Sequence, residues 1–254
     1  VVFKPGAKVV AVDGGSRQVT LESGEKIEYE KLLLAMGAAP KLPPVQGLDA
    51  VPHHVLRTLE DATTLQSKIR KGGTAAVLGA GLIGLHAAEN LAKGGMKVVV
   101  VEALSQVLPG YFDEEASLMI HRAFSENGVK ILLNEKVSRV KGTDGQITLG
   151  LDSGTDLPAG LLVVATGVQP RVECLKGSAV EVDEGILVDE RMRTNVSGIW
   201  AAGDVAQVVR RGLARPDQIR DGHGPENDGR LRRSQDGRLQ GLRRQGHDHV
   251  HASR

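Results

Sequence analysis

TAAVLGAGLIGLHAAENLAKGGMKVVVVE, residues 74–102, is the stretch that decides the fold. An apolar run leads into Gly79, Gly81 and Gly84, which have the spacing G-x-G-x-x-G. A helical pattern of apolar residues follows, and then a second apolar run that ends at the acid Glu102. This order predicts a strand, a tight turn, a helix and a second strand, the arrangement that binds a dinucleotide. A tight turn without any ligand is the alternative interpretation of the glycines.

Each part of this pattern has a physical task. The first glycine allows the tight turn, the second lets the backbone approach a pyrophosphate, and the third lets helix and strand pack closely. The helix start offers unpaired N–H groups to phosphates. Glu102 is placed to accept a hydrogen bond from the adenine-ribose 2′-hydroxyl and would repel a 2′-phosphate, which favours NADH over NADPH. The expected NAD contacts are Gly79, Ala80, Gly81, Leu82, Ile83, Gly84 and Glu102.

The chain also contains a diverged internal repeat. Residues 8–40 and 135–170 both show alternating strands, Gly/Asp turns and an apolar strand, and they end in Ala-Met-Gly (35–37) and Ala-Thr-Gly (165–167). Two copies of one nucleotide-binding fold are therefore expected. The upstream copy has too few residues before Lys8 for its own glycine turn, so we expect that residue 1 is not the natural start. Chance similarity between β-hairpins is the alternative, but it does not explain the shared endings.

These features resemble the FAD-dependent pyridine nucleotide–disulfide oxidoreductases. The resemblance is strongest to the branch with NADH oxidases, coenzyme A-disulfide reductases, and ferredoxin, rubredoxin and nitrite reductase flavoproteins. It covers roughly residues 1–209, and we expect it to end there. It rests on the glycine turn with Glu102 and on LLLAMGAAP (32–40), VLRTLEDA (55–62), LLVVATGVQP (161–170) and GILVDERMRTNVSGIWAAGDVA (185–206).

The resemblance implies an α/β fold with two Rossmann-like dinucleotide-binding domains, each of three layers (β/β/α). An NAD(H) domain, 44–168, would be inserted into an incomplete FAD domain made of 1–43 and 169–209. KLPPVQGLDAVP (41–52) would be the extended crossing between them. Asp113-Glu114-Glu115 is expected to open a helix and to complement its dipole, rather than to form a catalytic or metal site. Thr58, with Asp61 three residues later, is expected to cap another helix.

Further site residues follow from the resemblance. Asp204 would accept a hydrogen bond from the ribityl chain of FAD, Gly203 would allow close approach, and the helix start after them would face the flavin. Read without the family, Gly203-Asp204 is a strand-end turn with a helix N-cap. His86 stands where relatives commonly carry a Glu near nicotinamide and flavin, so it is the candidate catalytic residue, with simple packing on the helix as the alternative. The remaining expected contacts are Ala165 and Gly167 for NAD, and Ala35 and Gly37 for FAD.

The last 45 residues, 210–254, differ from the rest. They hold eleven arginines, no lysine and no persistent period, so we expect disorder or the product of a shifted reading frame. An Arg-rich tail that binds nucleic acid and a metal patch at HDHVH (247–251) are weaker readings, because no aromatic residues are interleaved and terminal histidines rarely form a closed site. We therefore expect neither a nucleic-acid partner nor a metal.

Composition agrees with a parallel-sheet protein, since aromatics make up 2% of the residues and 32 glycines are present. No apolar run is long enough for a membrane span, and Cys174 is the single cysteine and is read as structural. A cytoplasmic location is expected.

The resemblance implies transfer of hydride from NADH to FAD, with electrons passed to a disulfide, oxygen or an iron–sulfur or other electron-carrier protein. The intact family member is expected to be a homodimer. The alternatives are an electron-entry subunit of a larger oxidoreductase complex, a regulatory FAD/NAD-sensing module, or an inactive fragment that binds NAD only.

Overall fold

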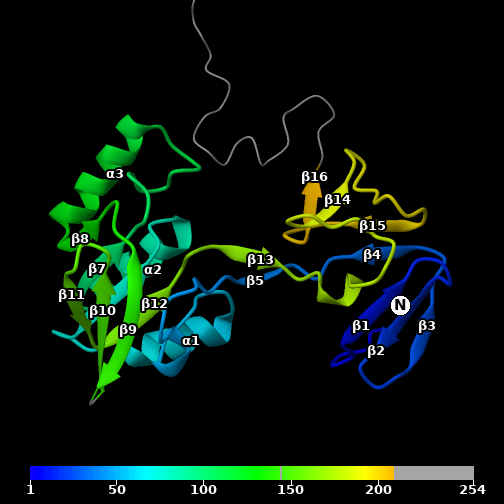
Figure 1. The fold of residues 1–254 in the computed structure, drawn as a ribbon, viewed down its shortest axis with the longest axis horizontal. Helices are drawn as coiled ribbons and strands as arrows, with labels where there is room; N and C mark the ends of the chain where they lie inside the picture. Colours follow the sequence, from blue (N-terminus) through cyan, green and yellow to red (C-terminus); the bar gives the residue numbers. More distant parts are fainter. Residues whose placement is uncertain (144, 209–254) are drawn as a thin grey trace, which may run out of the picture. The chain divides into compact units, whose positions relative to one another are not determined.

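The computed structural model of the chain describes residues 1–143 and 145–208 (Figure 1). A four-stranded parallel sheet lies at the centre of residues 44–168. Its order is β12 (Leu161–Val164), β6 (Thr74–Leu78), β7 (Lys97–Val101) and β8 (Val129–Leu132). These strands are short apolar runs, as expected for a parallel sheet that is covered on both faces.

Alternate side chains of β6 build two different cores, because successive residues of a strand point to opposite faces. Ala75 and Val77 pack with helices α2 (Leu82–Lys93) and α3 (Glu114–Glu126). Ala76 and Leu78 pack against an antiparallel sheet of β9 (Val137–Thr143), β10 (Gln146–Leu151) and β11 (Asp156–Ala159). The result is three layers, helices, parallel sheet and antiparallel sheet, as the sequence predicted for this half.

Residues on either side of this region form a separate core of their own. Strands β1 (Val9–Asp13), β2 (Gln18–Leu21) and β3 (Lys26–Glu28) make a second antiparallel sheet. Strand β4 (Leu32–Leu34) pairs in parallel with β15 (Ile199–Ala201), and β14 (Ile186–Val188) pairs in parallel with β16 (Ala206–Val208). Their buried side chains form one cluster that shares no residue with the other two.

The internal repeat is visible in the strand order. In each copy, three antiparallel strands lead to a strand of a parallel pairing and then to a short strand, β5 (Ala38–Pro40) or β13 (Val168–Pro170). These two short strands pair with each other, and the contact is reciprocal: Lys41 donates to the carbonyl of Gly167, and Arg171 donates to that of Gly37. Both glycines have positive φ, 67° at Gly37 and 109° at Gly167, which accounts for the shared Ala-x-Gly endings.

Two helix starts were predicted correctly. Thr58 and Asp61 form a reciprocal capping box at the start of α1 (Leu59–Lys68), with the Thr58 hydroxyl accepting from the Asp61 N–H at 3.1 Å. Asp113 caps α3 by accepting from the N–H of Ala116 at 2.9 Å. The acids that follow Asp113 thus lie in the first turn of a helix, where they complement its dipole.

The expected extended crossing at 41–52 is instead partly folded against the antiparallel sheet. A short 3-10 helix, η1 (Leu48–Ala50), buries Leu48 against a cluster that includes Val140. A Cβ on Gly47 would overlap the carbonyl oxygen of Val140, so the backbone passes in direct contact with β9. The prolines and glycine predicted a linker, but they could not show that an apolar residue inside it has a packing partner 92 positions away.

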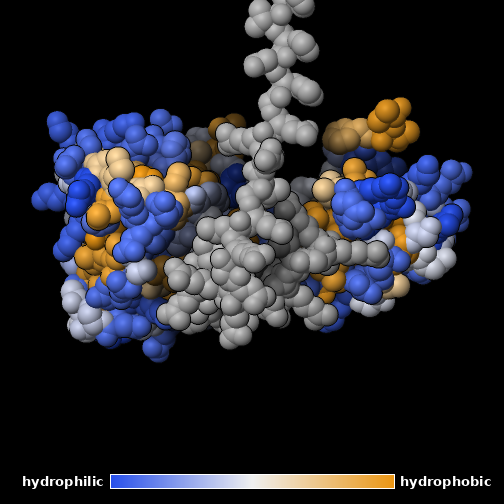
Figure 2. Space-filling model, turned by 90° about the horizontal axis from the view of Figure 1, so that it is seen from above, coloured by the Kyte–Doolittle hydropathy of each residue, from blue (hydrophilic) through white to orange (hydrophobic). Residues whose placement is uncertain are grey.

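The surface in Figure 2 mixes polar regions with exposed apolar patches. Among the described helices, none has the length and apolar character needed to cross a membrane. Cys174 is half-buried beside the core of the β1–β4 and β14–β16 region, and burial raises the pKa of its thiol. The predicted tail, 210–254, and its HDHVH segment lie outside the described residues.

Candidate functional site: a cavity at the glycine turn

The glycine turn connects β6 to α2 and has the geometry that its spacing predicted. Gly79 has φ 100°, and a Cβ there would overlap the carbonyl oxygen of Ala165. A Cβ on Gly84 would overlap the carbonyl oxygen of Gly79, so α2 lies directly against the turn. Around Gly81, by contrast, no atom of the described residues other than its chain neighbours lies within 4 Å of the Cβ position. The first and third glycines are thus needed for the protein's own packing, while the second faces open space.

The open space lies at the start of α2. Gly81 is the N-cap residue, no side chain caps the helix, and no acid stands in its first turn. The first N–H groups of a helix have no partner inside the helix, and its dipole is positive at this end. Most helices satisfy this end with a Ser, Thr or Asp side chain, as α1 and α3 do here. An uncapped start that faces open space fits an anionic ligand group such as a phosphate.

A cavity of about 590 Å³ begins at this turn. Its size is within the range of sites for nucleotide-sized ligands. Leu82 and Ile83, which border it, are half exposed although both are large and apolar. Its lining comes from the carboxyl ends of β6, β7 and β12 and from nearby loops: Pro40, Leu56, Arg57, Gly79, Gly81, Leu82, Ile83, Glu102, Pro109, Gly110, Tyr111, Val164, Ala165, Thr166, Gly167 and Val168.

Glu102 is the single carboxylate among the described residues of that lining, and it is held in place by two backbone N–H groups. Its Oε2 accepts from Ala80 at 2.6 Å and its Oε1 from Leu104 at 2.9 Å. The residue is 9% exposed. The carboxylate therefore fastens the glycine turn to the loop after β7, a structural task that the sequence reading missed. Each oxygen keeps a second lone pair for a ligand hydroxyl.

A second group of predicted residues lies at the carboxyl ends of β4 and β15. These ends meet at one edge because the two strands are parallel, and Ala202 donates to the carbonyl of Leu34 there. Gly203 and Asp204 follow β15, and Ala35 and Gly37 follow β4. Gly203 has φ 76° with open space at its Cβ position, and Asp204 is exposed. The residues assigned to FAD from β4 and β15 thus share one edge.

The helix expected directly after Asp204 is not formed in residues 205–208. The chain turns, with Ala206 donating to the carbonyl of Gly203, and continues as β16 beside β14. The alternative interpretation of Gly203-Asp204 as a helix N-cap is therefore wrong. Both the turn chemistry and the resemblance favoured a helix, whereas Val205 is fully buried and directs the segment into the core beside Ile186.

Arg57 joins the two groups of residues, and the sequence reading did not single it out. It lines the cavity at the glycine turn, and its guanidinium forms an ion pair with the carboxylate of Asp204 at 2.6 Å. Its backbone N–H donates to Asp61, which also accepts from Thr58; that bond from Thr58 is the main cause of a lowered pKa at Asp61. VLRTLEDA (55–62) is one of the motifs that resemble the family. The position of Arg57 four residues before Asp61 is the sequence feature that could have indicated a role for Arg57.

His86 lies on the exposed side of α2 and is not among the residues that line the cavity. The amide of Asn90 donates to its carbonyl at 2.8 Å, and the same amide lies 3.4 Å from its Nε2. Its assignment to nicotinamide and flavin therefore stays a prediction. In the part of the chain that the structure describes, no cluster of three or more His, Cys, Asp or Glu could hold a metal.

The chain is similar to known proteins in sequence and in fold. The family model "Pyridine nucleotide-disulphide oxidoreductase" matches residues 2–225, which extends beyond residue 209, where the resemblance was expected to end. The chain is 48% identical over 202 residues to the epsilon subunit of NADH-dependent phenylglyoxylate dehydrogenase from Aromatoleum evansii, covering 80% of this chain and 48% of that subunit.

Solved structures agree with the family match. Putidaredoxin reductase, in its covalent complex with putidaredoxin, superposes with a TM-score of 0.76 at 30% identity, over 81% of this chain and 51% of the reductase. An engineered water-forming NADPH oxidase bound to NADPH superposes with a TM-score of 0.72 at 26% identity, over 78% of this chain and 45% of the oxidase. The chain spans about half the length of these relatives. It belongs to the pyridine nucleotide–disulphide oxidoreductase family of FAD-dependent NAD(P)H oxidoreductases.

Proposed function

We propose that this chain binds NADH in the cavity at the glycine turn and forms part of a flavoprotein reductase that transfers its electrons to a redox acceptor. One observation carries the proposal. An uncapped helix start, an open second glycine and a fixed carboxylate line one cavity, and that cavity shares Arg57 with the Asp204 edge. The order of the phosphate and ribose partners is the one in which a dinucleotide presents its groups, which supports the proposal.

The residues present fit NADH in the following way. The N–H groups at Leu82 and Ile83 would face the pyrophosphate, and Gly81 would lie against it. Glu102 would accept from ribose hydroxyls through the lone pairs that the backbone bonds leave free. Ala165 and Gly167 line the same cavity on the β12 side, where the nicotinamide half would extend.

The residues at the second edge fit part of FAD. Asp204, Gly203, Ala35 and Gly37 surround the carboxyl ends of β4 and β15, where ligands bind in open α/β sheets. Arg57 supplies a positive charge at this edge. A bound FAD would supply the chemistry of hydride transfer from NADH and electron transfer to the acceptor. The three separate hydrophobic cores support an FAD domain of 1–43 and 169–209 around an NAD domain of 44–168.

NADH is preferred to NADPH under this proposal because a 2′-phosphate would meet the carboxylate of Glu102. The related NADPH oxidase was made by substitutions that include a glycine-to-alanine and an aspartate-to-alanine change, separated by the same number of residues as Gly84 and Glu102. That pair matches the third glycine and the acid of the motif here. Loss of the acid thus accompanies the use of NADPH in that protein.

The acceptor that the comparisons favour is a partner within a larger enzyme. The phenylglyoxylate dehydrogenase epsilon subunit is 48% identical, whereas the reductase in the putidaredoxin complex is 30% identical. We propose that this chain acts in the cell as the NADH-linked flavin subunit of a multi-subunit dehydrogenase. A free-standing reductase for a small redox protein is the second candidate, and the putidaredoxin complex supports it.

The test uses the full chain, titrated first with NADH and NADPH and then with FAD. We expect NADH to bind at least about tenfold more tightly than NADPH, since removal of the charge conflict at Glu102 corresponds to about 1.4 kcal/mol or more. With FAD added, NADH should bleach the flavin absorbance under anaerobic conditions. Equal affinity for the two nucleotides would contradict the role of Glu102, and no binding of either would reject the site. If the chain co-purifies with the other subunits of a dehydrogenase, its acceptor is a partner within that enzyme. If it does not, the acceptor is a small redox protein.

A further inference from the structure

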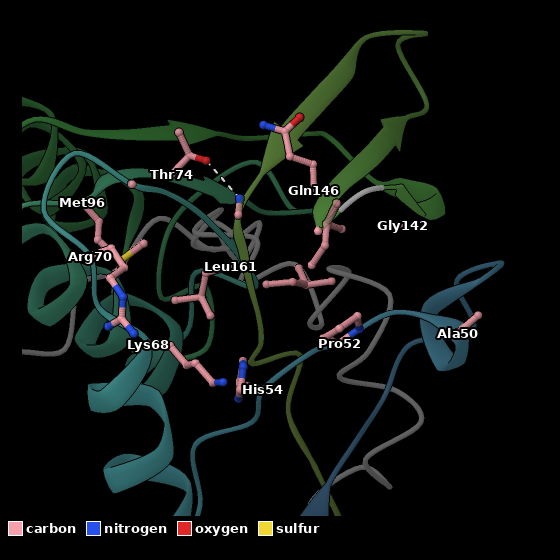
Figure 3. Close-up of a pocket in the computed structure, with 15 residues that line it drawn as sticks. Ala50, Pro52, His54, Lys68, Arg70, Thr74, Met96, Gly142, Gln146 and Leu161 are labelled. Atoms are coloured by element: carbon pink, nitrogen blue, oxygen red, sulfur yellow. Dashed lines mark hydrogen bonds between the residues drawn. The ribbon is translucent and has the colours of Figure 1, made fainter.

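A second cavity of about 600 Å³ lies at the opposite end of the parallel sheet (Figure 3). Thr74 and Leu161, which begin β6 and β12, line it, whereas the glycine-turn cavity lies beyond the carboxyl ends of the same two strands. Because β6 has five residues and a strand rises about 3.3 Å per residue, the two cavities are separated by the length of the sheet. No described residue lines both cavities.

The floor of this second cavity is apolar and fixed. Met96, Ile147, Leu161 and Leu162 line it, and each is buried in one of the hydrophobic cores. Strand pairing holds Leu161 and Leu162 beside β6. An apolar ligand group in contact with these side chains would find a surface that needs no rearrangement, which lowers the cost of binding.

Basic side chains stand on one side of the cavity, and none of the described residues that line it is acidic. Lys68 is the last residue of α1 and Arg70 lies two residues further along the chain; neither forms an ion pair with any described residue. Arg70 is anchored, because its Nη1 donates to the carbonyls of Ser67 and Ile69. Its other N–H groups remain without an acceptor among the described residues, so they are available to a ligand.

His54 completes this side of the cavity. Its backbone is fixed beside β12, with its N–H donating to Leu162 at 2.9 Å and its carbonyl accepting from Val164 at 2.7 Å. Figure 3 shows the Lys68 ammonium group pointing toward the His54 ring. Burial first, and then the charge of Lys68, lower the pKa of His54. Both effects favour the neutral ring, which can act as a hydrogen-bonding group, while Lys68 and Arg70 supply the positive charge.

We propose that this cavity binds a small organic anion, with its anionic group at Lys68 and Arg70 and its apolar body against Met96 and Leu161. Two cations that have no carboxylate partner among the described residues favour an anion, and the buried apolar floor favours an organic one over inorganic phosphate. The site is independent of the proposed NADH site, because the two cavities lie at opposite ends of the strands. Both ligands should bind at the same time.

The probe is 8-anilinonaphthalene-1-sulfonate, a singly charged aromatic anion whose fluorescence rises in apolar surroundings, titrated into the full chain. Lys68→Ala combined with Arg70→Ala should weaken its binding about tenfold or more, since bonds to charged groups contribute about 1.5–3 kcal/mol each. The control variant combines Arg122→Ala with Lys130→Ala, which changes the net charge equally at exposed positions outside the cavity. Its affinity for the probe should equal that of the unmodified chain.

Two competition experiments complete the test. Sodium 1-naphthoate should displace the probe, whereas inorganic phosphate at equal ionic strength and saturating NADH should not. Equal binding by the two double variants would overturn the proposal. Displacement by phosphate as effective as by naphthoate would show that the apolar floor contributes nothing, and displacement by NADH would place the probe in the glycine-turn cavity. Each of these results would reject the site whether or not NADH itself binds as proposed.

Discussion

Gly81→Ala should separate NADH binding from folding. Gly81 has φ −76° and ψ −178°, a conformation open to any residue, and no atom of the described residues other than its chain neighbours lies within 4 Å of its Cβ position. Alanine reduces the entropy of the unfolded chain, which stabilises by about 0.4–1 kcal/mol. Alanine is a poorer N-cap residue than glycine by a similar amount. The two effects oppose each other, so the free energy of unfolding should change by less than about 1 kcal/mol.

The effect on NADH should be much larger. The added methyl group occupies the space through which the pyrophosphate would approach the N–H groups at the start of α2. Loss of one charge-assisted hydrogen bond costs about 1.5–3 kcal/mol, which is about a 10- to 100-fold increase in Kd. Isothermal titration of the full chain with NADH measures this change, and thermal unfolding followed by circular dichroism measures stability.

Two further variants define the controls. Gly79→Ala should damage both folding and binding, because φ is 100° and the Cβ would overlap the Ala165 carbonyl oxygen. Gly160→Ala should change neither folding nor NADH binding. The described atom nearest to its Cβ position, the backbone oxygen of Thr74, is 3.5 Å away, and Gly160 lies at the other end of the sheet from the glycine turn. If Gly81→Ala kept the normal Kd for NADH at normal stability, the nucleotide could not lie against the start of α2, and the reasoning would fail.

Three other predictions follow from single contacts. Glu102→Gln should lower the free energy of unfolding by about 1–3 kcal/mol, measured by urea denaturation, because the amide NH₂ must face one of two buried backbone N–H groups; unchanged stability would contradict the fastening role of the carboxylate. Thr58→Ala should cost about 1 kcal/mol and lower the Tm by about 2–4 °C, whereas Thr64→Ala in the same helix should not; equal Tm values would exclude the capping box. Because the pKa of His54 is lowered in the folded chain, its ring binds a proton at a higher pH in the unfolded chain than in the folded one. The stability contributed by the neutral ring is therefore present above pH 6.5 and is lost as the pH falls. A His54→Asn variant should show a smaller loss of stability from pH 7 to 5, and an identical pH profile would refute this.

Local sequence patterns predicted the parts of the fold that depend on nearby residues. The glycine spacing predicted the turn between β6 and α2, because each glycine answers to a contact within the same strand–turn–helix unit. Thr58 and Asp113 were predicted as helix starts because each cap is a hydrogen bond to the backbone N–H three residues further along the chain. Alternating apolar residues in the two repeat copies likewise predicted the hairpin strands of both antiparallel sheets.

Contacts between distant segments could not be predicted in this way. The resemblance and turn chemistry both favoured a helix after Asp204, but burial of Val205 and pairing with β14 make the segment a strand. The 41–52 segment had the composition of a linker, yet Leu48 packs beside β9. Arg57 was missed because its partner, Asp204, is 147 residues away in the sequence.

The sequence by itself determined where a dinucleotide could bind, since the turn, the uncapped helix start and Glu102 lie within 24 residues of one another. Only the tertiary structure decided that Glu102 fastens that turn, that Arg57 reaches Asp204, and that cationic and apolar residues surround a second cavity at the other end of the sheet. The physical reason is that backbone conformation and capping depend on neighbours along the chain. Ion pairs and cavities depend instead on which strand ends and loops the packed sheet brings together.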